Sequence, residues 1–178
     1  MPLFGRSQFG YLLGSAALIV VVLAIVVRWT ADARRVRAAL VGGAAAAVAN
    51  IGLDVVAHHA GWWAYIEAST PFGPFAYYVL AGLGFTVFVL IGAKVESRFG
   101  VPGVVAFASA LGIYGTVRDH RLADRYGLMR FDRGLGVAFL DGLFEYVLPF
   151  AVALAVSWLA GRRGSGRLSS RRSGAPSA

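Results

Sequence analysis

The chain has 178 residues and a formal net charge of +8, and 58% of its residues are hydrophobic while only 15% are charged. A soluble domain has about 45–50% apolar and about 25% charged residues, so the composition excludes an ordinary soluble domain and favours an integral membrane protein. The basic balance does not indicate nucleic-acid binding, because the arginines stand between apolar runs without a basic motif. Since the chain contains no cysteine, disulfides, thiol catalysis and cysteine-ligated iron–sulfur clusters are excluded.

Five apolar runs follow one another along the chain, and a membrane helix needs about 20 such residues. They cover approximately residues 9–27, 38–56, 75–92, 101–117 and 135–159. The pattern predicts an all-α integral membrane protein with about five transmembrane helices in one bundle, formed by residues 1–160. Residues 161–178 are rich in Gly, Ser and Arg, which predicts a disordered, basic cytoplasmic tail.

The distribution of basic residues predicts the orientation of this bundle. Five crossings place the two termini on opposite sides, and basic residues concentrate on the cytoplasmic side. With the N-terminus outside, eleven lysines and arginines are cytoplasmic and six are external. We therefore expect an N-out/C-in topology. The exception is the loop 118–134, which places five arginines outside, together with three aspartates that can compensate them.

The second apolar run carries a stripe of polar residues. Asn50, Asp54 and His58 follow at steps of four. Residues four apart lie on the same face of a helix, so a polar face is expected on an otherwise apolar helix.

Ionisable residues of three separate segments are expected at one depth, near the outer interface. Asp54 and His58 end the second run, Arg118 and His120 follow the fourth, and Asp141 and Glu145 begin the fifth. All three histidines of the chain belong to this region. We therefore take as candidate catalytic residues Asp54, His58, Asp141, Glu145, Arg118 and His120.

Asp141 and Glu145 stand four positions apart in the apolar segment FLDGLFEYVLPF. A carboxylate at the centre of a membrane helix costs about 2.5–3.5 kcal/mol on insertion scales, and like charges at this spacing repel. Such a pair persists only if it is protonated, paired with a cation or bound to a metal. We expect it to face the interior of the bundle.

Three interpretations of this polar set remain open. In the first, it is a structural network in which Arg118 or Arg133 neutralises the carboxylates of the fifth run, while Asp54 holds His58. In the second, it is the acid/base site of a membrane-embedded enzyme that opens at the outer interface. In the third, it lines a pathway for protons or ions.

No motif in the chain identifies a cofactor. The spacing of Asp54 and His58, and of Asp141 and Glu145, would allow two helices to share a metal ion through carboxylate and imidazole ligands. However, the motifs HExxH and ExxH are absent, as are the P-loop, GxGxxG and GxSxG. Whether a metal binds is left open by the sequence.

The segment GWWAYIEASTPFGPFAYY is rich in aromatic residues and lies between the second and third runs. It is typical of an aromatic belt at the lipid head groups, or of a cover over a lipophilic cleft. The plan is similar in a general way to small membrane proteins of carotenoid and isoprenoid metabolism, although the PxEE signature of heterodimeric lycopene cyclases is missing. An architectural similarity does not fix function, but in the enzyme interpretation a lipid or isoprenoid-type substrate would suit such aromatic walls.

The expected partners are the lipid bilayer, a lipophilic small molecule and further copies of the chain in a homo-oligomer. The composition, rich in Ala, Gly, Val and Arg with a single lysine, is typical of a high-GC bacterial genome, which predicts a multi-pass protein of the bacterial plasma membrane.

Overall fold

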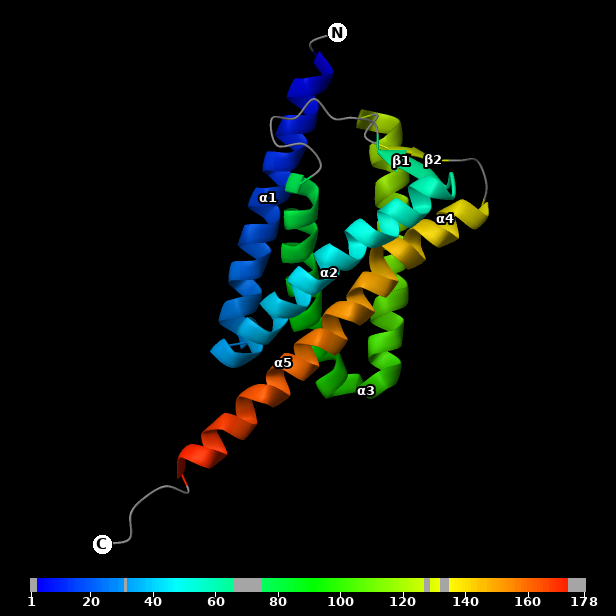
Figure 1. The fold of residues 1–178 in the computed structure, drawn as a ribbon. Coiled ribbons are helices and arrows are strands. Elements are labelled where there is room, and N and C mark those ends of the chain that lie inside the picture. Colours follow the sequence, from blue (N-terminus) through cyan, green and yellow to red (C-terminus); the bar gives the residue numbers. More distant parts are fainter. Residues whose placement is uncertain (1–2, 31, 66–74, 127–128, 132–134, 173–178) are drawn as a thin grey trace, which may run out of the picture.

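The computed structural model describes residues 3–30, 32–65, 75–126, 129–131 and 135–172. The described chain is helical apart from two short strands, and its elements in order are α1 (Leu3–Thr30), α2 (Ala33–His59), β1 (Trp63–Tyr65), α3 (Phe75–Tyr126), β2 (Met129–Phe131), α4 (Leu135–Asp141), the π-helical segment η1 (Gly142–Val147) and α5 (Leu148–Arg172). The last three form one continuous rod (Figure 1). Helix α5 continues to Arg172, and residues 173–178 lie outside the described residues. The predicted tail from residue 161 therefore stays a prediction.

Among the described residues, four helical segments are long and apolar enough to cross a membrane. They are Gly10–Thr30, Ala33–His59, Phe75–Arg121 and Gly136–Arg162. The prediction of a helical chain with several apolar helices that could cross a membrane is thus confirmed, with four candidate spans instead of five separate helices. The difference lies in α3, which contains two of the predicted runs.

A break at Gly100 divides α3 into two arms. A straight helix of its 52 residues would extend for about 78 Å, far more than the roughly 30 Å of a hydrocarbon core. Gly100 has φ 65° and ψ −161°, a conformation that residues with a Cβ rarely adopt, and Pro102 opens the second arm. The second arm therefore returns alongside the first (Figure 1).

Helix α2 packs between α3 and α5 through a face of small residues. A methyl group on Gly42 would overlap the carbonyl oxygen of Ala153 in α5, and one on Gly43 would overlap Thr86 in α3. Without these side chains, the helix backbones approach closely, which is a common way to pack helices in membranes. This close approach places the polar stripe of α2 against both neighbouring helices.

The apolar core occupies the half of the bundle away from the strands. Phe85, Phe88, Phe107 and Phe150 form a series of edge-to-face ring contacts with centroids 5.5 to 6.5 Å apart. These rings join both arms of α3 to α5, and edge-to-face pairs of this kind add to the stabilisation from burial.

Strands β1 and β2 pair antiparallel, in the register Trp63 with Phe131, Ala64 with Arg130 and Tyr65 with Met129. The sequence pattern did not predict this pairing, although it placed both segments on the same side of the membrane. The pairing brings the end of α2 and the end of α3 together at one end of the bundle (Figure 1).

The π-helical segment η1 directly precedes Pro149. A proline lacks the N–H that would bond the carbonyl of Glu145 four residues earlier, and its ring collides with that carbonyl in an α-helix. The backbone instead widens, and the N–H of Leu148 bonds the carbonyl of Leu143, five residues back. Glu145 and Tyr146 therefore project from a π-turn, so the α-helical spacing assumed for Asp141 and Glu145 does not apply.

Candidate functional site

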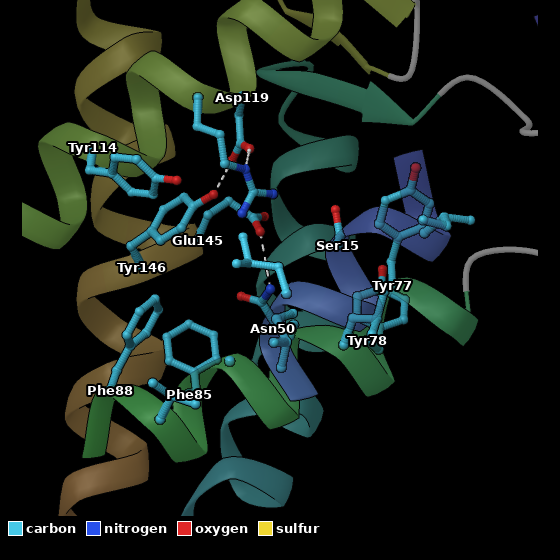
Figure 2. Close-up of a pocket in the computed structure, with 18 of the residues that line it drawn as sticks. Ser15, Asn50, Tyr77, Tyr78, Phe85, Phe88, Tyr114, Asp119, Glu145 and Tyr146 are labelled. Atoms are coloured by element: carbon cyan, nitrogen blue, oxygen red, sulfur yellow. Dashed lines mark hydrogen bonds and ion pairs between the residues drawn. The ribbon is translucent and has the colours of Figure 1, made fainter. Parts of the chain in front are cut away.

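A cavity of about 580 Å³ lies between α1, the two arms of α3 and η1. One part of its wall is apolar and consists of residues such as Leu18, Ile19, Val22, Phe85 and Phe88. The other part is polar, and its members include Ser15, Asn50, Tyr77, Tyr78, Arg118, Asp119, Glu145 and Tyr146. Figure 2 shows Asp119 and Glu145 on one side of the cavity and Phe85 and Phe88 on another.

Glu145 lies at the polar end of the cavity and is 6% exposed. The side-chain amide of Asn50, on α2, donates a hydrogen bond of 3.1 Å to its Oε2 atom (Figure 2). The small-residue packing of α2 against η1 and α5 makes this contact possible. The amide thus orients the carboxyl group of Glu145 relative to the cavity.

Asp54 lies one turn further along α2 and is also buried. The indole Nε1–H of Trp63 donates to Oδ1 at 3.0 Å, and the Tyr78 hydroxyl donates to Oδ2 at 2.9 Å. The Asp54 carboxyl is in contact with that of Glu145. Asp54 itself does not line the cavity, but it is connected to it through Glu145 and Tyr78.

Asp119 is held from two sides at the upper end of the cavity. The Tyr146 hydroxyl donates to its Oδ2 atom at 2.6 Å, and Arg118 Nε lies 3.0 Å from its Oδ1 atom (Figure 2). Gly115 makes room for this arrangement, because a methyl group there would overlap the ring of Tyr146. Arg118, a predicted site residue, therefore pairs with its neighbour Asp119.

Asp141 is fully buried at the junction of α4 and η1. Within the described part of the chain, neither of its carboxyl oxygens receives a hydrogen bond. The nearby hydroxyl of Thr116 donates instead to the carbonyl of Ala138 at 3.0 Å. The prediction that Asp141 faces the interior agrees with its burial.

The two histidines of the predicted set lie apart from the cavity. His58 is exposed at the end of α2, where it contacts the exposed His59 edge-to-face at 6.0 Å. His120 is half-buried and stacks on Phe131 of β2, with ring centroids 4.1 Å apart. Neither histidine lines the cavity.

The spacing argument for His58 misplaced its side chain. Beyond Asp54, the buried face of α2 continues through Ala57 and not through His58. The indole N–H of the buried Trp63 donates to the Asp54 carboxylate. The contact proposed between Asp54 and His58 is thus replaced by the one with Trp63.

The predicted convergence of carboxyl groups is present in the structure. It includes Asp119, which was not among the candidate catalytic residues. Asp54, Asp119 and Asp141 all lie close enough to Glu145 to interact electrostatically with its carboxyl group. All four carboxyl groups are buried. Within the described residues, the one salt bridge to this cluster comes from Arg118. It pairs with Asp119 and leaves the other three carboxyl groups without a salt bridge in the described structure.

The described residues contain no group of three or more His, Asp and Glu side chains arranged to hold a metal ion. The carboxyl cluster instead binds hydrogen-bond donors, namely an amide, an indole and two tyrosine hydroxyls.

Sequence reasoning missed several residues that hold the site together. Trp63, Tyr78 and Tyr146 each donate to a buried carboxyl group. The sequence suggested a hydroxyl contribution from Tyr78, whereas Trp63 and Tyr146 were not assigned to the site. Asn50 was recognised in the stripe but not assigned to the site. The signal that could have found it is its step of four from Asp54 on the buried face of α2.

No known protein family, curated protein sequence or solved structure shows significant similarity to this chain.

Proposed function

We propose that this multi-pass membrane protein is an enzyme that binds a lipophilic small molecule in its cavity and transfers a proton through Glu145. The observation that carries the proposal is the position of the Glu145 carboxyl group. It is buried, it contacts a second carboxyl group, and it lies at the polar end of a cavity whose opposite end is hydrocarbon-like.

The pair formed by Asp54 and Glu145 is suited to acid/base chemistry. Two adjacent carboxyl groups without a cation between them favour holding one proton in common, as in the paired carboxyl groups of aspartic proteases. Glu145 lines the cavity and is the member that would exchange this proton with a ligand. Asp54 does not line the cavity and is a positioning residue, since Trp63 and Tyr78 hold its two carboxyl oxygens.

The apolar end of the cavity favours a hydrocarbon chain. Cavities of about 300–1,000 Å³ lined by apolar side chains with a few polar groups are typical small-molecule sites. One wall belongs to α1, many of whose residues are exposed on the surface of the bundle. A lipid or isoprenoid-type chain could therefore enter from the bilayer beside α1.

For the topology, we propose that both arms of α3 cross the membrane, which makes five crossings in the bacterial plasma membrane with the N-terminus outside. The strands and the polar end of the cavity would then face the extracytoplasmic side.

A pathway for protons is the second candidate, and the series of four neighbouring carboxyl groups favours it. The two candidates make different predictions. A relay would move protons across liposomes without any lipid substrate, and Glu145→Gln would abolish that flux. The enzyme would show no proton flux, either as the parent protein or as Glu145→Gln.

The test of the enzyme compares lipid extracts by mass spectrometry from cells that produce the parent protein and cells that produce Glu145→Gln. We expect a lipid species that is present with the parent and lost with the variant. The matched control is Glu96→Gln, an exposed glutamate far from the cavity, which should preserve the product. Identical extracts from parent and Glu145→Gln cells would refute the proposal.

A further inference from the structure

The polar end of the cavity contains hydrogen-bond acceptors that no group in the described structure satisfies. Asn50 Oδ1 and Glu145 Oε1 are both buried and receive no hydrogen bond from the described residues. Their side chains are 5% and 6% exposed, and both line the cavity (Figure 2). A buried acceptor without a donor is unfavourable, and a ligand that supplies the donor removes this cost.

The orientation of the Asn50 amide follows from its chemistry. Its Nδ2 atom faces the Glu145 carboxyl, which offers only acceptors when ionised, so the amide nitrogen must occupy that position. The amide oxygen then points elsewhere and stays an acceptor. An amide flip would oppose two oxygen atoms whenever Glu145 is ionised or holds its shared proton towards Asp54, so the assigned orientation is the favourable one.

The charges around the cavity oppose an anionic ligand. Four buried carboxyl groups gather at this end, and the guanidinium group of Arg118 is already paired with Asp119. Even if the pair formed by Asp54 and Glu145 holds a shared proton, the sum of these charges is not positive. A phosphate or carboxylate head group would meet like charge in a poorly solvated site, which opposes its binding.

We propose that the ligand of this cavity is a long-chain molecule whose head group donates hydrogen bonds and carries no negative charge, namely an alcohol or an amine. The head group donates to Asn50 Oδ1 and Glu145 Oε1, while the chain lies against α1 and the first arm of α3. This inference rests on the proposed function and names its class of substrate. It excludes fatty acids and lipid phosphates.

The experiment uses the purified full chain in detergent micelles and a hexadecanol that carries a photoreactive diazirine in its chain. Four competitors share one hydrocarbon chain and differ only in the head group: hexadecanol, hexadecylamine, palmitate and hexadecyl phosphate. Labelled peptides are mapped by mass spectrometry. We expect labelling of α1 and α3 at the cavity wall, and competition by the alcohol or the amine at concentrations at least about tenfold lower than by the two anions.

Two variants test the acceptors directly. Glu145→Gln replaces an acceptor by an N–H donor of nearly the same shape, and Asn50→Leu removes the amide oxygen. Each should weaken competition by hexadecanol about tenfold, while Glu96→Gln should leave it unchanged. If Asn50→Leu does not give monodisperse protein, Glu145→Gln alone decides, because it preserves the shape of the site.

The outcomes separate this inference from the proposed function. If palmitate or hexadecyl phosphate competes as well as hexadecanol, or if Glu145→Gln binds the alcohol unchanged, the head-group inference is wrong and the lipophilic cavity still stands. If no chain labels the cavity wall, both proposals fail.

Discussion

Asn50 and Glu145, which are 95 positions apart, form a 3.1 Å hydrogen bond between two buried side chains. The bond joins the polar stripe of α2 to the π-turn that precedes Pro149. It thus connects two irregular features of the sequence in a single contact. Its strength and its role can be measured.

The first prediction concerns the energy of this contact. Asn50→Ala leaves Glu145 Oε2 buried without its donor, and we expect it to lower the free energy of unfolding by about 1–3 kcal/mol. A double-mutant cycle with Glu145→Leu, which removes the acceptor, measured by reversible unfolding in mixed micelles, should give a coupling energy of about 1 kcal/mol or more. Strictly additive effects would show that the two side chains do not interact in the folded protein.

The second prediction concerns the close approach of α2 and α3. Gly43→Ala should destabilise the bundle, because its methyl group would overlap Thr86 and the backbone of Gly82. We expect a loss of about 1–3 kcal/mol, as in overpacked cores, read as a lower thermal unfolding midpoint. The matched control is Gly52→Ala in the same helix.

No atom lies within 4 Å of a methyl group built on Gly52, and alanine has a better helix propensity than glycine. The control should therefore be neutral or slightly stabilising. Equal effects of the two substitutions would contradict the packing of α2 described above.

The third prediction concerns Trp63, which is buried and donates to Asp54. Trp63→Phe preserves much of the aromatic ring but removes the N–H, so Asp54 Oδ1 is left without its donor. We expect destabilisation by about 1–3 kcal/mol. Trp29→Phe is the control, because Trp29 is 76% exposed and should have an effect of no more than about 0.5 kcal/mol. The hydrogen bond is refuted if both variants unfold at the same midpoint.

The fourth prediction concerns topology and uses the absence of cysteine from the chain. Single cysteines at the exposed positions His59 and Arg121 should react with a membrane-impermeant maleimide in intact cells. Cysteines at the exposed positions Arg35 and Arg98 should react only after the membrane is opened. The reverse pattern would invert the proposed orientation, and labelling of Arg98 together with His59 would show that the first arm of α3 does not cross.

The candidate site was predictable only where the periodicity of a regular helix holds. Asp54 and Asn50 lie on one buried face because α2 is regular there, and the burial of Asp141 and Glu145 followed from the cost of exposing carboxyl groups to lipid. The prediction for His58 placed its side chain wrongly because His58 lies at the end of α2, where the helix is exposed. The partner of Arg118 could not be predicted, since the carboxyl groups of Asp119, Asp141 and Glu145 were all expected at one depth and only the fold decides which of them its guanidinium group meets.

The sequence by itself determined that this chain forms long apolar helices that could cross a membrane, because each backbone group of a helix is bonded within the helix and the apolar side chains suit surrounding hydrocarbon. It also determined that the polar residues of three segments lie at one end of the bundle. Only the tertiary structure decided which of them meet. The pairing of β1 with β2, the fold of α3 at Gly100 and the π-turn before Pro149 depend on contacts between distant segments. These contacts brought Asn50 to Glu145 and Trp63 to Asp54, while both histidines remained outside the cavity.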